Sequence, residues 1–249
     1  MKKTLVALAC AFPILLCGCS NAGTSHQGIS DDTQVTAEQD VAPTAKDLKL
    51  DIIFEDLQIY QNALGDTCAT YVAELKNASE TAISIKNTSI DVEKPDGTLL
   101  TSTDFFSVYP RVVPAGESAF ICQDIINGLN EGITADLIGT AILHYDLEPR
   151  SDTESVSIEL SELTLGSQYS YPKFMGRIKN IGSTDLSNVY VAAPIRDANG
   201  VLQAVGFTII ETLAAGETKG FEQTCMSAST NLDYSNSSLT AFAYDGSLY

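Results

Sequence analysis

The sequence PAGES at residues 114–118 recurs further along the chain as AAGET at residues 214–218. Other short matches flank both copies in the same order: Lys76-Asn77 with Lys179-Asn180, Asp96-Gly97 with Asn199-Gly200, and Tyr145-Asp146 with Tyr244-Asp245. The spacing between the copies is far longer than the roughly 20–50-residue units of solenoids and propellers, so each copy has the size of a domain. The sequence therefore predicts two tandem copies of one fold.

Short β-strands are expected between these matches. In the first copy they cover 48–60 with a bulge, 71–76, 83–92, 98–113, 118–125 and 135–146. In the second copy they cover 156–165, 174–178, 189–195, 201–210, 217–225 and 239–244. Apolar residues alternate with other residues in equivalent strands and are expected to face inward: Tyr71, Ala73 and Leu75 in the first copy, and Phe174, Gly176 and Ile178 in the second.

Turn signals separate these strands at regular intervals. Asp96-Gly97 in particular predicts a hairpin, since these residue types tolerate the backbone angles of tight turns. Many short strands with regular turns are typical of an antiparallel β-sandwich. We therefore expect an all-β protein with two tandem immunoglobulin-like β-sandwiches, a first domain at 48–149 and a second at 150–249.

The order of strands, Lys-Asn, acidic turn and Ala-Gly-Glu resembles the FxLYD-type immunoglobulin-like domain of bacterial lipoproteins and surface proteins. The name-giving pattern maps to APIRD at 193–197 in the second copy, where Ile195 and Asp197 fit. In the first copy it maps to IDVEK at 90–94, which keeps apolar residues but lacks the Tyr and the Asp. The resemblance covers most of both copies. It implies a sandwich module of largely unassigned function and carries no catalytic residue over.

The N-terminus has the layout of a secretory signal peptide. Met1-Lys2-Lys3 is basic, and the apolar run that follows at 5–16 is too short to span a bilayer, which takes about 20 residues. The run ends in LCGC at 16–19, which resembles a bacterial lipobox with an unusual second residue, Cys17. This resemblance implies that 1–18 is removed and that Cys19 carries the lipid. An ordinary signal peptide with incidental cysteines is the alternative.

Residues 19–47 are rich in Ser, Thr, Ala, Gln and Asp and contain almost no large apolar residues. Such a segment cannot bury a core, so we expect a disordered tether with an end-to-end distance of roughly 30 Å. Several acyl chains on Cys19 would hold the protein stably, whereas a single chain would not. The expected location is extracytoplasmic, at the cell membrane through the lipid anchor.

The chain is strongly acidic, with a formal net charge of −18 that becomes −20 when Lys2 and Lys3 leave with the signal peptide. This sign opposes nucleic-acid binding, because Lys and Arg supply the affinity for phosphates. Anionic lipid headgroups should also repel the folded part. The acidity provides solubility, or it forms a binding face for cations or basic partners.

The folded part contains three cysteines, Cys68, Cys122 and Cys225, and one histidine, His144. Strand alternation places Cys122 and Cys225 on inward faces, so we expect buried free thiols. A disulfide between Cys68 and Cys122 is the alternative. His144 is expected on a solvent-facing side of its strand. Phe105, Phe106 and Tyr109 lie where the first copy is longer than the second, and this insertion is the first place to look for a ligand.

No catalytic, cofactor-binding or metal-binding residues are predicted. The folded part has no second histidine, no closely spaced pair of cysteines and no Asp-x-Asp-x-Asp-Gly loop, so zinc and calcium motifs are missing from the sequence. We expect a non-enzymatic, lipid-anchored module that binds an unidentified surface protein or acts as a spacer. The alternative is a lipoprotein that binds a small ligand or a cation such as calcium.

Overall fold

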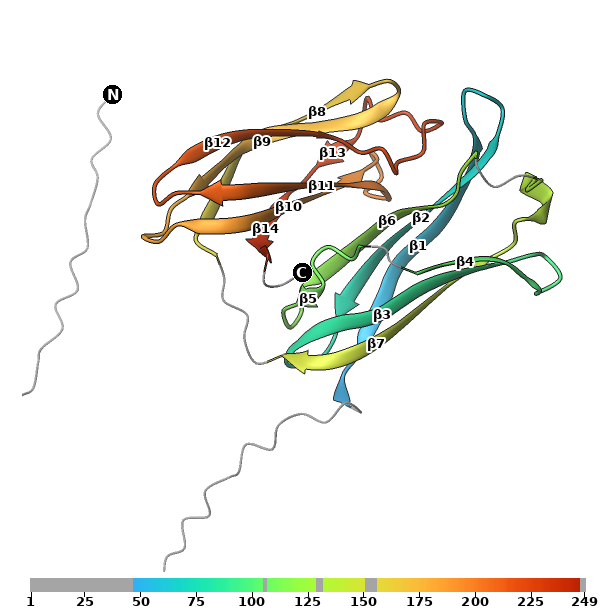
Figure 1. The fold of residues 1–249 in the computed structure, drawn as a ribbon, viewed down its shortest axis with the longest axis horizontal. Helices are drawn as coiled ribbons and strands as arrows, with labels where there is room; N and C mark the ends of the chain where they lie inside the picture. The colour runs from blue at the N-terminus through green and yellow to red at the C-terminus, as the bar shows by residue number, and fades with distance from the viewer. Residues whose placement is uncertain (1–46, 105–106, 129–131, 151–155, 247–249) are drawn as a thin grey trace, which may run out of the picture. The chain divides into compact units, whose positions relative to one another are not determined.

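The computed structural model describes residues 47–104, 107–128, 132–150 and 156–246 (Figure 1). The expected signal peptide, the lipid attachment at Cys19 and the tether up to residue 46 lie outside these residues, as do Phe105 and Phe106. The described part belongs to one compact unit, Ala42–Tyr249, and is all-β apart from a short 3-10 helix. It contains no helix that is long and apolar enough to cross a membrane.

The first β-sandwich consists of two antiparallel sheets. One has the order β1-β2-β6, formed by β1 (Leu50–Gln61), β2 (Thr67–Asn77) and β6 (Ser118–Ile126). The other is built on β3 (Ala82–Glu93), with β7 (Ala141–Arg150) along one edge. On the opposite edge, β4 (Leu99–Asp104) and β5 (Val112–Val113) follow one another.

The second β-sandwich repeats this arrangement. Its first sheet has the order β8-β9-β12, formed by β8 (Ile158–Gln168), β9 (Tyr171–Asn180) and β12 (Thr218–Thr224). Its second sheet is built on β10 (Leu186–Arg196), with β11 (Leu202–Leu213) on one edge. On the other edge lie β13 (Ser238–Leu239) and β14 (Phe242–Asp245). The internal repeat is therefore a repeat of strand topology, and the all-β sandwich prediction is confirmed.

All pairing between the named strands stays within 50–150 or within 158–245. The predicted boundary between 149 and 150 lies at the last residue of β7. The two sandwiches lie in one compact unit. The division of the chain into two domains therefore stays a prediction.

The strand starts and ends differ from the prediction in places. The bulge in the first strand is confirmed by a register shift between Ile52 and Phe54. The closing strand of the first copy begins at Ala141 rather than 135, because 135–137 form a 3-10 helix. At Gly139 the chain passes so close to the preceding hairpin that a Cβ would lie 2.7 Å from the carbonyl carbon of Lys94. The strand expected at 98–113 is divided into β4 and β5.

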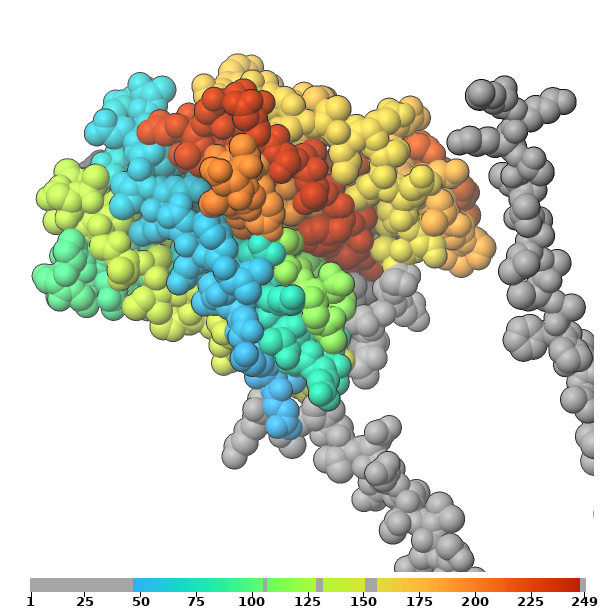
Figure 2. All heavy atoms as spheres, turned by 180° about the vertical axis from the view of Figure 1, so that it is seen from behind, coloured from blue at the N-terminus to red at the C-terminus, as the bar shows by residue number. Residues whose placement is uncertain are grey.

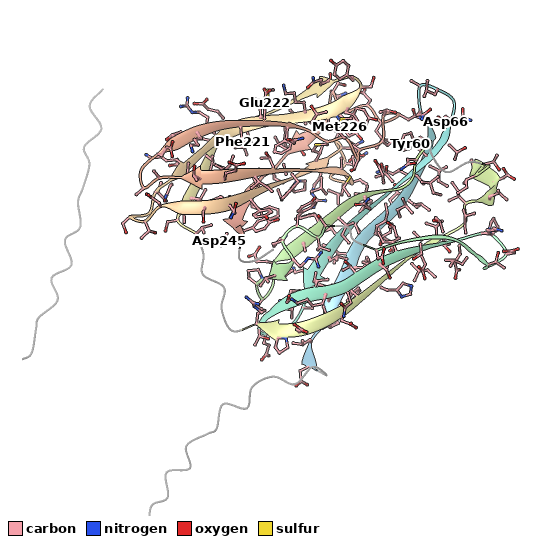
Figure 3. All side chains as sticks on the ribbon, in the orientation of Figure 1. Tyr60, Asp66, Phe221, Glu222, Met226 and Asp245 are labelled. Carbon is pink, nitrogen blue, oxygen red and sulfur yellow. The ribbon has the colours of Figure 1, made fainter. Side chains whose placement is uncertain are left out.

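The predicted inward sets form the two cores. Tyr71, Ala73 and Leu75 are buried in the first sandwich, and Phe174 and Ile178 in the second. Gly176 lies between the latter two, where a Cβ would come within 2.7 Å of the Leu163 and Phe221 side chains. Alternation continues in the neighbouring strand β12, where Phe221 is buried and the next residue, Glu222, is exposed (Figure 3).

A buried asparagine explains why the Lys-Asn and Ala-Gly-Glu sequences recur together. In the first sandwich, Asn77 at the end of β2 is fully buried. Its Nδ2 donates to the carbonyls of Thr81 at 2.9 Å, Val113 at 2.9 Å and Pro114 at 3.1 Å. Because β2 and β5 belong to different sheets, this side chain ties the two sheets together at one end.

Asn180 joins the two sheets of the second sandwich in the equivalent way. Its Nδ2 donates to the carbonyls of Thr184 at 2.8 Å and Leu213 at 3.1 Å, and its Oδ1 accepts from the Gly182 N–H at 2.9 Å. The turn also binds the backbone of the asparagine. Gly216 N donates to Asn180 O, and Asn180 N donates to Glu217 O, as Gly116 and Glu117 do with Asn77.

The glycine of this turn is required by its backbone conformation. Gly116 has φ of 77° and Gly216 has φ of 75°, in the left-handed region that other residues disfavour. The two repeated sequences are therefore the two halves of one structural device. We call this device, formed by Asn77 with 113–117 and by Asn180 with 213–217, the asparagine tie.

In the closing strands, the sequence match of Tyr145-Asp146 with Tyr244-Asp245 is displaced by one residue from the structural equivalence. The core-facing pairs are Ile90 opposite Leu143 in the first sandwich and Val191 opposite Ala243 in the second. Tyr145, two residues after Leu143, packs in its own core, and its hydroxyl donates to Leu50 O at 3.4 Å. Tyr244 follows Ala243 directly and faces the other way. The matching Tyr-Asp letters therefore do not occupy equivalent positions.

The asparagine tie predicts the effect of Asn180→Asp. The substitution keeps the shape but removes the donor, and it puts a carboxylate against two carbonyl oxygens. We expect a loss of about 3 kcal/mol in the free energy of unfolding at neutral pH, measured by denaturant titration. Burial raises the folded-state pKa of the new carboxyl above its unfolded value. The loss should therefore be smallest below the unfolded pKa and should grow as pH rises through the folded pKa.

The exposed residue Asn236 provides the matched control. Asn236→Asp should change the free energy of unfolding by less than about 0.5 kcal/mol, as is usual for surface substitutions. Equal small effects of the two substitutions would show that the tie contributes little to stability.

Candidate functional site

The outer face of the β1-β2-β6 sheet is covered by the second sandwich. Val72 on β2 alternates with the core residue Tyr71, as expected, but it is fully buried. Together with Phe120 and Cys122 of β6, it packs in the same cluster as the core of the second sandwich. The outer face of this sheet therefore forms an interface with the second sandwich.

The second sandwich contributes the outer face of its β10-β11-β14 sheet to this interface. The ring of Phe207 on β11 stacks on Tyr109 with centroids 4.2 Å apart, and Phe242 on β14 lies 5.7 Å from Phe120. Gln58 Nε2 donates to the Gln203 carbonyl at 3.0 Å. Figure 2 shows the strands of the first sandwich, in blue and cyan, against the orange and red strands of the second.

The tyrosine of the predicted aromatic insertion belongs to this interface. Tyr109 stacks on Phe207 and forms an isolated β-bridge with Phe120. Its role in the structure is therefore packing between the sandwiches.

The equivalent face of the second sandwich is less buried. Counted from the asparagine tie, the second-sandwich equivalents of the covered residues are half-buried or exposed: Met175 for Val72, Arg177 for Glu74, Gly220 for Phe120 and Glu222 for Cys122. On the outer face of the β3-β7 sheet, Asp91 pairs with His144 at 3.2 Å, and the imidazole is 50% exposed. His144 is thus on a solvent-facing side of its strand, as predicted.

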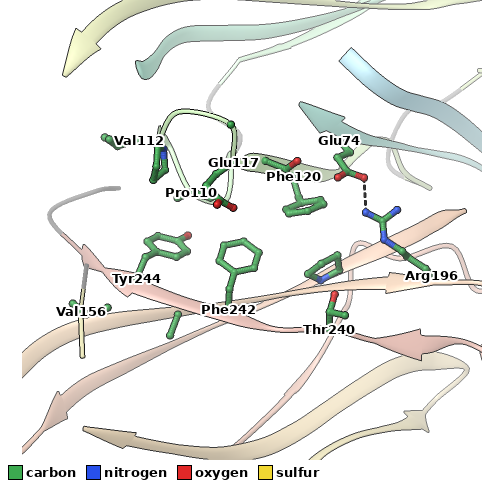
Figure 4. Close-up of a pocket in the computed structure, with 15 residues that line it drawn as sticks. Glu74, Pro110, Val112, Glu117, Phe120, Val156, Arg196, Thr240, Phe242 and Tyr244 are labelled. Atoms are coloured by element: carbon green, nitrogen blue, oxygen red, sulfur yellow. Dashed lines mark hydrogen bonds and ion pairs between the residues drawn. The ribbon is translucent and has the colours of Figure 1, made fainter. Parts of the chain in front are cut away.

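A cavity of about 540 Å³ opens at one end of this interface (Figure 4). Its size falls within the range of small-molecule pockets. Both sandwiches line it: Glu74, Pro110, Val112, Pro114, Gly116, Glu117, Ser118 and Phe120 from the first, and Val156, Pro194, Arg196, Thr240, Phe242, Ala243 and Tyr244 from the second.

An ion pair closes one side of the cavity. Arg196 Nη2 donates to Glu74 Oε2, and the two side chains are only 25% and 12% exposed. The guanidinium also donates to Gly200 O at 3.2 Å and lies 6.0 Å from the centroid of the Phe120 ring. Its charge and donors are thus engaged by protein groups. Sequence reasoning missed this pair because its members are far apart in the sequence.

Aromatic rings form the opposite wall. Phe242 and Tyr244 stack side by side on β14 with centroids 5.9 Å apart, and Tyr190 of β10 stacks behind Tyr244 at 5.5 Å. In Figure 4 the rings of Phe120, Phe242 and Tyr244 border the cavity, and Glu117 projects toward the same space. The cavity therefore combines aromatic faces with a carboxylate.

The three cysteines of the described part are buried free thiols. The predicted disulfide alternative is wrong because Cys122 lies opposite Val72, four positions along β2 from Cys68, or about 13 Å. Cys225 faces its own core, where a Cβ at Gly206 would lie 2.9 Å from its sulfur. Cys122 was expected to face inward in its own sandwich. Instead it faces the second sandwich, with Sγ 3.7 Å from Ser227 O.

The acidic turn residues accept hydrogen bonds from the backbone of their own turns. Hydrogen bonds from Thr98 lower the pKa of Asp96, and those from Val201 and Asn199 lower the pKa of Asp197. Across the described ranges, no group of three or more His, Cys, Asp or Glu side chains is placed to hold a metal ion. These turns therefore give the calcium alternative no support.

Comparisons with known proteins identify no relative. No family model matches the chain, and no curated protein matches it. Among solved structures, a calcium-binding mutant of Bacteroides uniformis beta-glucuronidase 2 matches with 13% identity and a TM-score of 0.22, over 67% of this chain and 23% of that one. A Bacteroides uniformis beta-glucuronidase matches with 12% identity and a TM-score of 0.22, over 72% of this chain and 28% of that one. The chain thus spans about a quarter of these enzymes, and such low scores carry no argument about its activity.

Cys122 reports directly on the interface between the sandwiches. Burial raises its pKa to about 12, so roughly one thiol in ten thousand is ionised at pH 8. We expect iodoacetamide to label Cys122 at least about a hundredfold more slowly in the native protein than in urea, followed by mass spectrometry of the peptides.

Cys225 is the internal control, because its sulfur packs against Gly206 of its own sandwich. Slow labelling of both thiols agrees with a closed interface. Rapid labelling of Cys122 with continued protection of Cys225 would show that the sandwiches separate readily.

Proposed function

We propose that this protein is a lipid-anchored, extracytoplasmic, non-enzymatic lipoprotein that binds another surface protein or acts as a spacer. The lipobox-like LCGC sequence at 16–19 supports the anchor, with Cys19 as the lipidated residue. The composition of 19–47 supports a tether between the membrane and the sandwiches. The order of the repeated sequences supports kinship with FxLYD-type domains.

The observation that carries this proposal is the apolar interface between the sandwiches. Val72 and Phe120 are buried against the second sandwich, and Tyr109 stacks on Phe207. Two sandwiches joined by such contacts present surfaces in a fixed relation, whereas freely jointed ones do not. A body of this kind suits a spacer or a protein-binding module at the end of a tether.

A small-ligand lipoprotein is the second candidate function. The cavity of about 540 Å³, with its aromatic and charged lining, is the specific observation that favours it. A ligand that binds only the native protein raises the melting temperature. A thermal-melt screen with amines, sugars, peptides and calcium would therefore distinguish this function from a purely mechanical one.

The anchor is tested by Cys19→Ser, because a hydroxyl at this position does not accept the diacylglyceryl group that the thiolate accepts. We expect the variant to move from the membrane fraction to the soluble extracytoplasmic fraction, measured by fractionation and immunoblotting after a high-salt wash.

Cys17→Ser is the matched control and should stay in the membrane fraction. Continued membrane association of Cys19→Ser would contradict the anchor. Turnover of a substrate that a single substitution abolishes would contradict the non-enzymatic role.

A further inference from the structure

The glutamate of the repeated Ala-Gly-Glu sequence has two partners in the second sandwich. Glu217 Oε2 accepts from the Ala214 N–H at 2.8 Å and lies 3.5 Å from Lys219 Nζ. The first contact fixes the turn of the asparagine tie, and the second offsets the charge. In this copy the carboxylate has a structural role.

Neither partner exists in the first sandwich. The residue equivalent to Ala214 is Pro114, which has no N–H to donate, and the residue equivalent to Lys219 is Ala119. Among the described residues, the Glu117 carboxylate has no hydrogen bond or ion pair. The glutamate is kept in both copies, but in the first its side chain is free of the structural role.

Glu117 instead lines the cavity between the sandwiches. The three rings of Phe120, Phe242 and Tyr244 border the same space (Figure 4). Phe120 and Tyr244 are buried, whereas Phe242 is partly exposed. Aromatic faces carry the negative end of the ring quadrupole and attract organic cations. A carboxylate and an aromatic lining around one cavity are therefore complementary to a positive group.

We propose that this cavity binds an organic cation, namely an ammonium group carried on methyl groups or on a short alkyl chain. Glu117 supplies the opposite charge, and Phe242, the one of the three rings that is not buried, supplies the aromatic face. The inference deepens the second candidate function and is independent of the membrane anchor. Both a free amine and a lysine side chain of a partner protein present this chemistry.

The other charges of the cavity favour a cation over an anion. Arg196 is the cationic residue of the lining, and Glu74 and the Gly200 carbonyl already engage its guanidinium. With that pair neutral overall, Glu117 leaves the lining with a net negative charge. The acidity of the whole chain, −18 in formal charge, acts in the same direction.

Choline is the first probe, and its neutral isostere 3,3-dimethylbutanol has the same shape without the charge. We expect calorimetric titration at low ionic strength to give saturable binding of choline, at least about tenfold tighter than the isostere. Nα-acetyl-lysine amide and a simple alkylamine are titrated in parallel. Tighter binding of the lysine derivative assigns the cation to a partner protein, and tighter binding of choline or the amine assigns it to a free molecule.

Glu117→Gln should weaken binding of the cation about five- to tenfold without changing the melting temperature, because this carboxylate is exposed and makes no contact that stabilises the fold. Glu217→Gln is the matched control in the second sandwich and should leave binding unchanged. Phe242→Leu removes a ring and keeps an apolar side chain of similar volume. It should weaken the binding of choline more than the binding of the neutral isostere.

Equal affinity for choline and its isostere, an unchanged affinity in Glu117→Gln, or no saturable binding of any cation at millimolar concentrations would overturn the inference. Binding of a neutral sugar in the cavity without binding of the cations would also overturn the inference of a cation site. It would still support the second candidate function, the binding of a small ligand. Membrane fractionation of Cys19→Ser tests the anchor separately.

Discussion

Each sandwich depends on a buried amide that joins its two sheets. Asn77 and Asn180 end the second strand of their sandwiches and donate to the carbonyls of Val113 at the end of β5 and Leu213 at the end of β11, in the opposite sheet. A buried amide must have its hydrogen bonds satisfied, so the chain around it can adopt few other arrangements. The left-handed glycine and the following glutamate complete the turn that surrounds the amide. The asparagine tie thus sets how the two sheets of each sandwich meet.

With the tie common to both copies, the differences between them lie on the outer faces. The covered face of the first sandwich carries Val72, Phe120 and Cys122, whereas the equivalent positions of the second carry Met175, Gly220 and Glu222. Burial of apolar side chains provides the driving force that joins the sandwiches. The same divergence leaves Glu117 without its structural partners, at the mouth of a cavity that only the joined sandwiches form. Assembly of the two copies therefore creates a site that neither copy contains alone.

Local sequence patterns were sufficient to predict the strands, the inward sets, the hairpin at Asp96-Gly97 and the buried thiols. They were not sufficient for the interface, because Val72 and Glu74 obey the same alternation whether their face meets water or another sheet. A position-by-position comparison of the two copies would have indicated the interface, because the apolar residue Phe120 in the first copy corresponds to Gly220 in the second. The 3-10 helix at 135–137 and the register of Tyr244 were missed because they follow from tertiary packing rather than from local propensity.

The central claim is that the asparagine ties and the apolar interface make the two sandwiches one cooperative body. Differential scanning calorimetry of the purified protein tests this directly, since two-state unfolding gives equal calorimetric and van't Hoff enthalpies. The account predicts a single transition with a ratio of these enthalpies of about 1. Two resolved transitions, or a ratio of about 2, would show that the sandwiches unfold independently and would contradict the account.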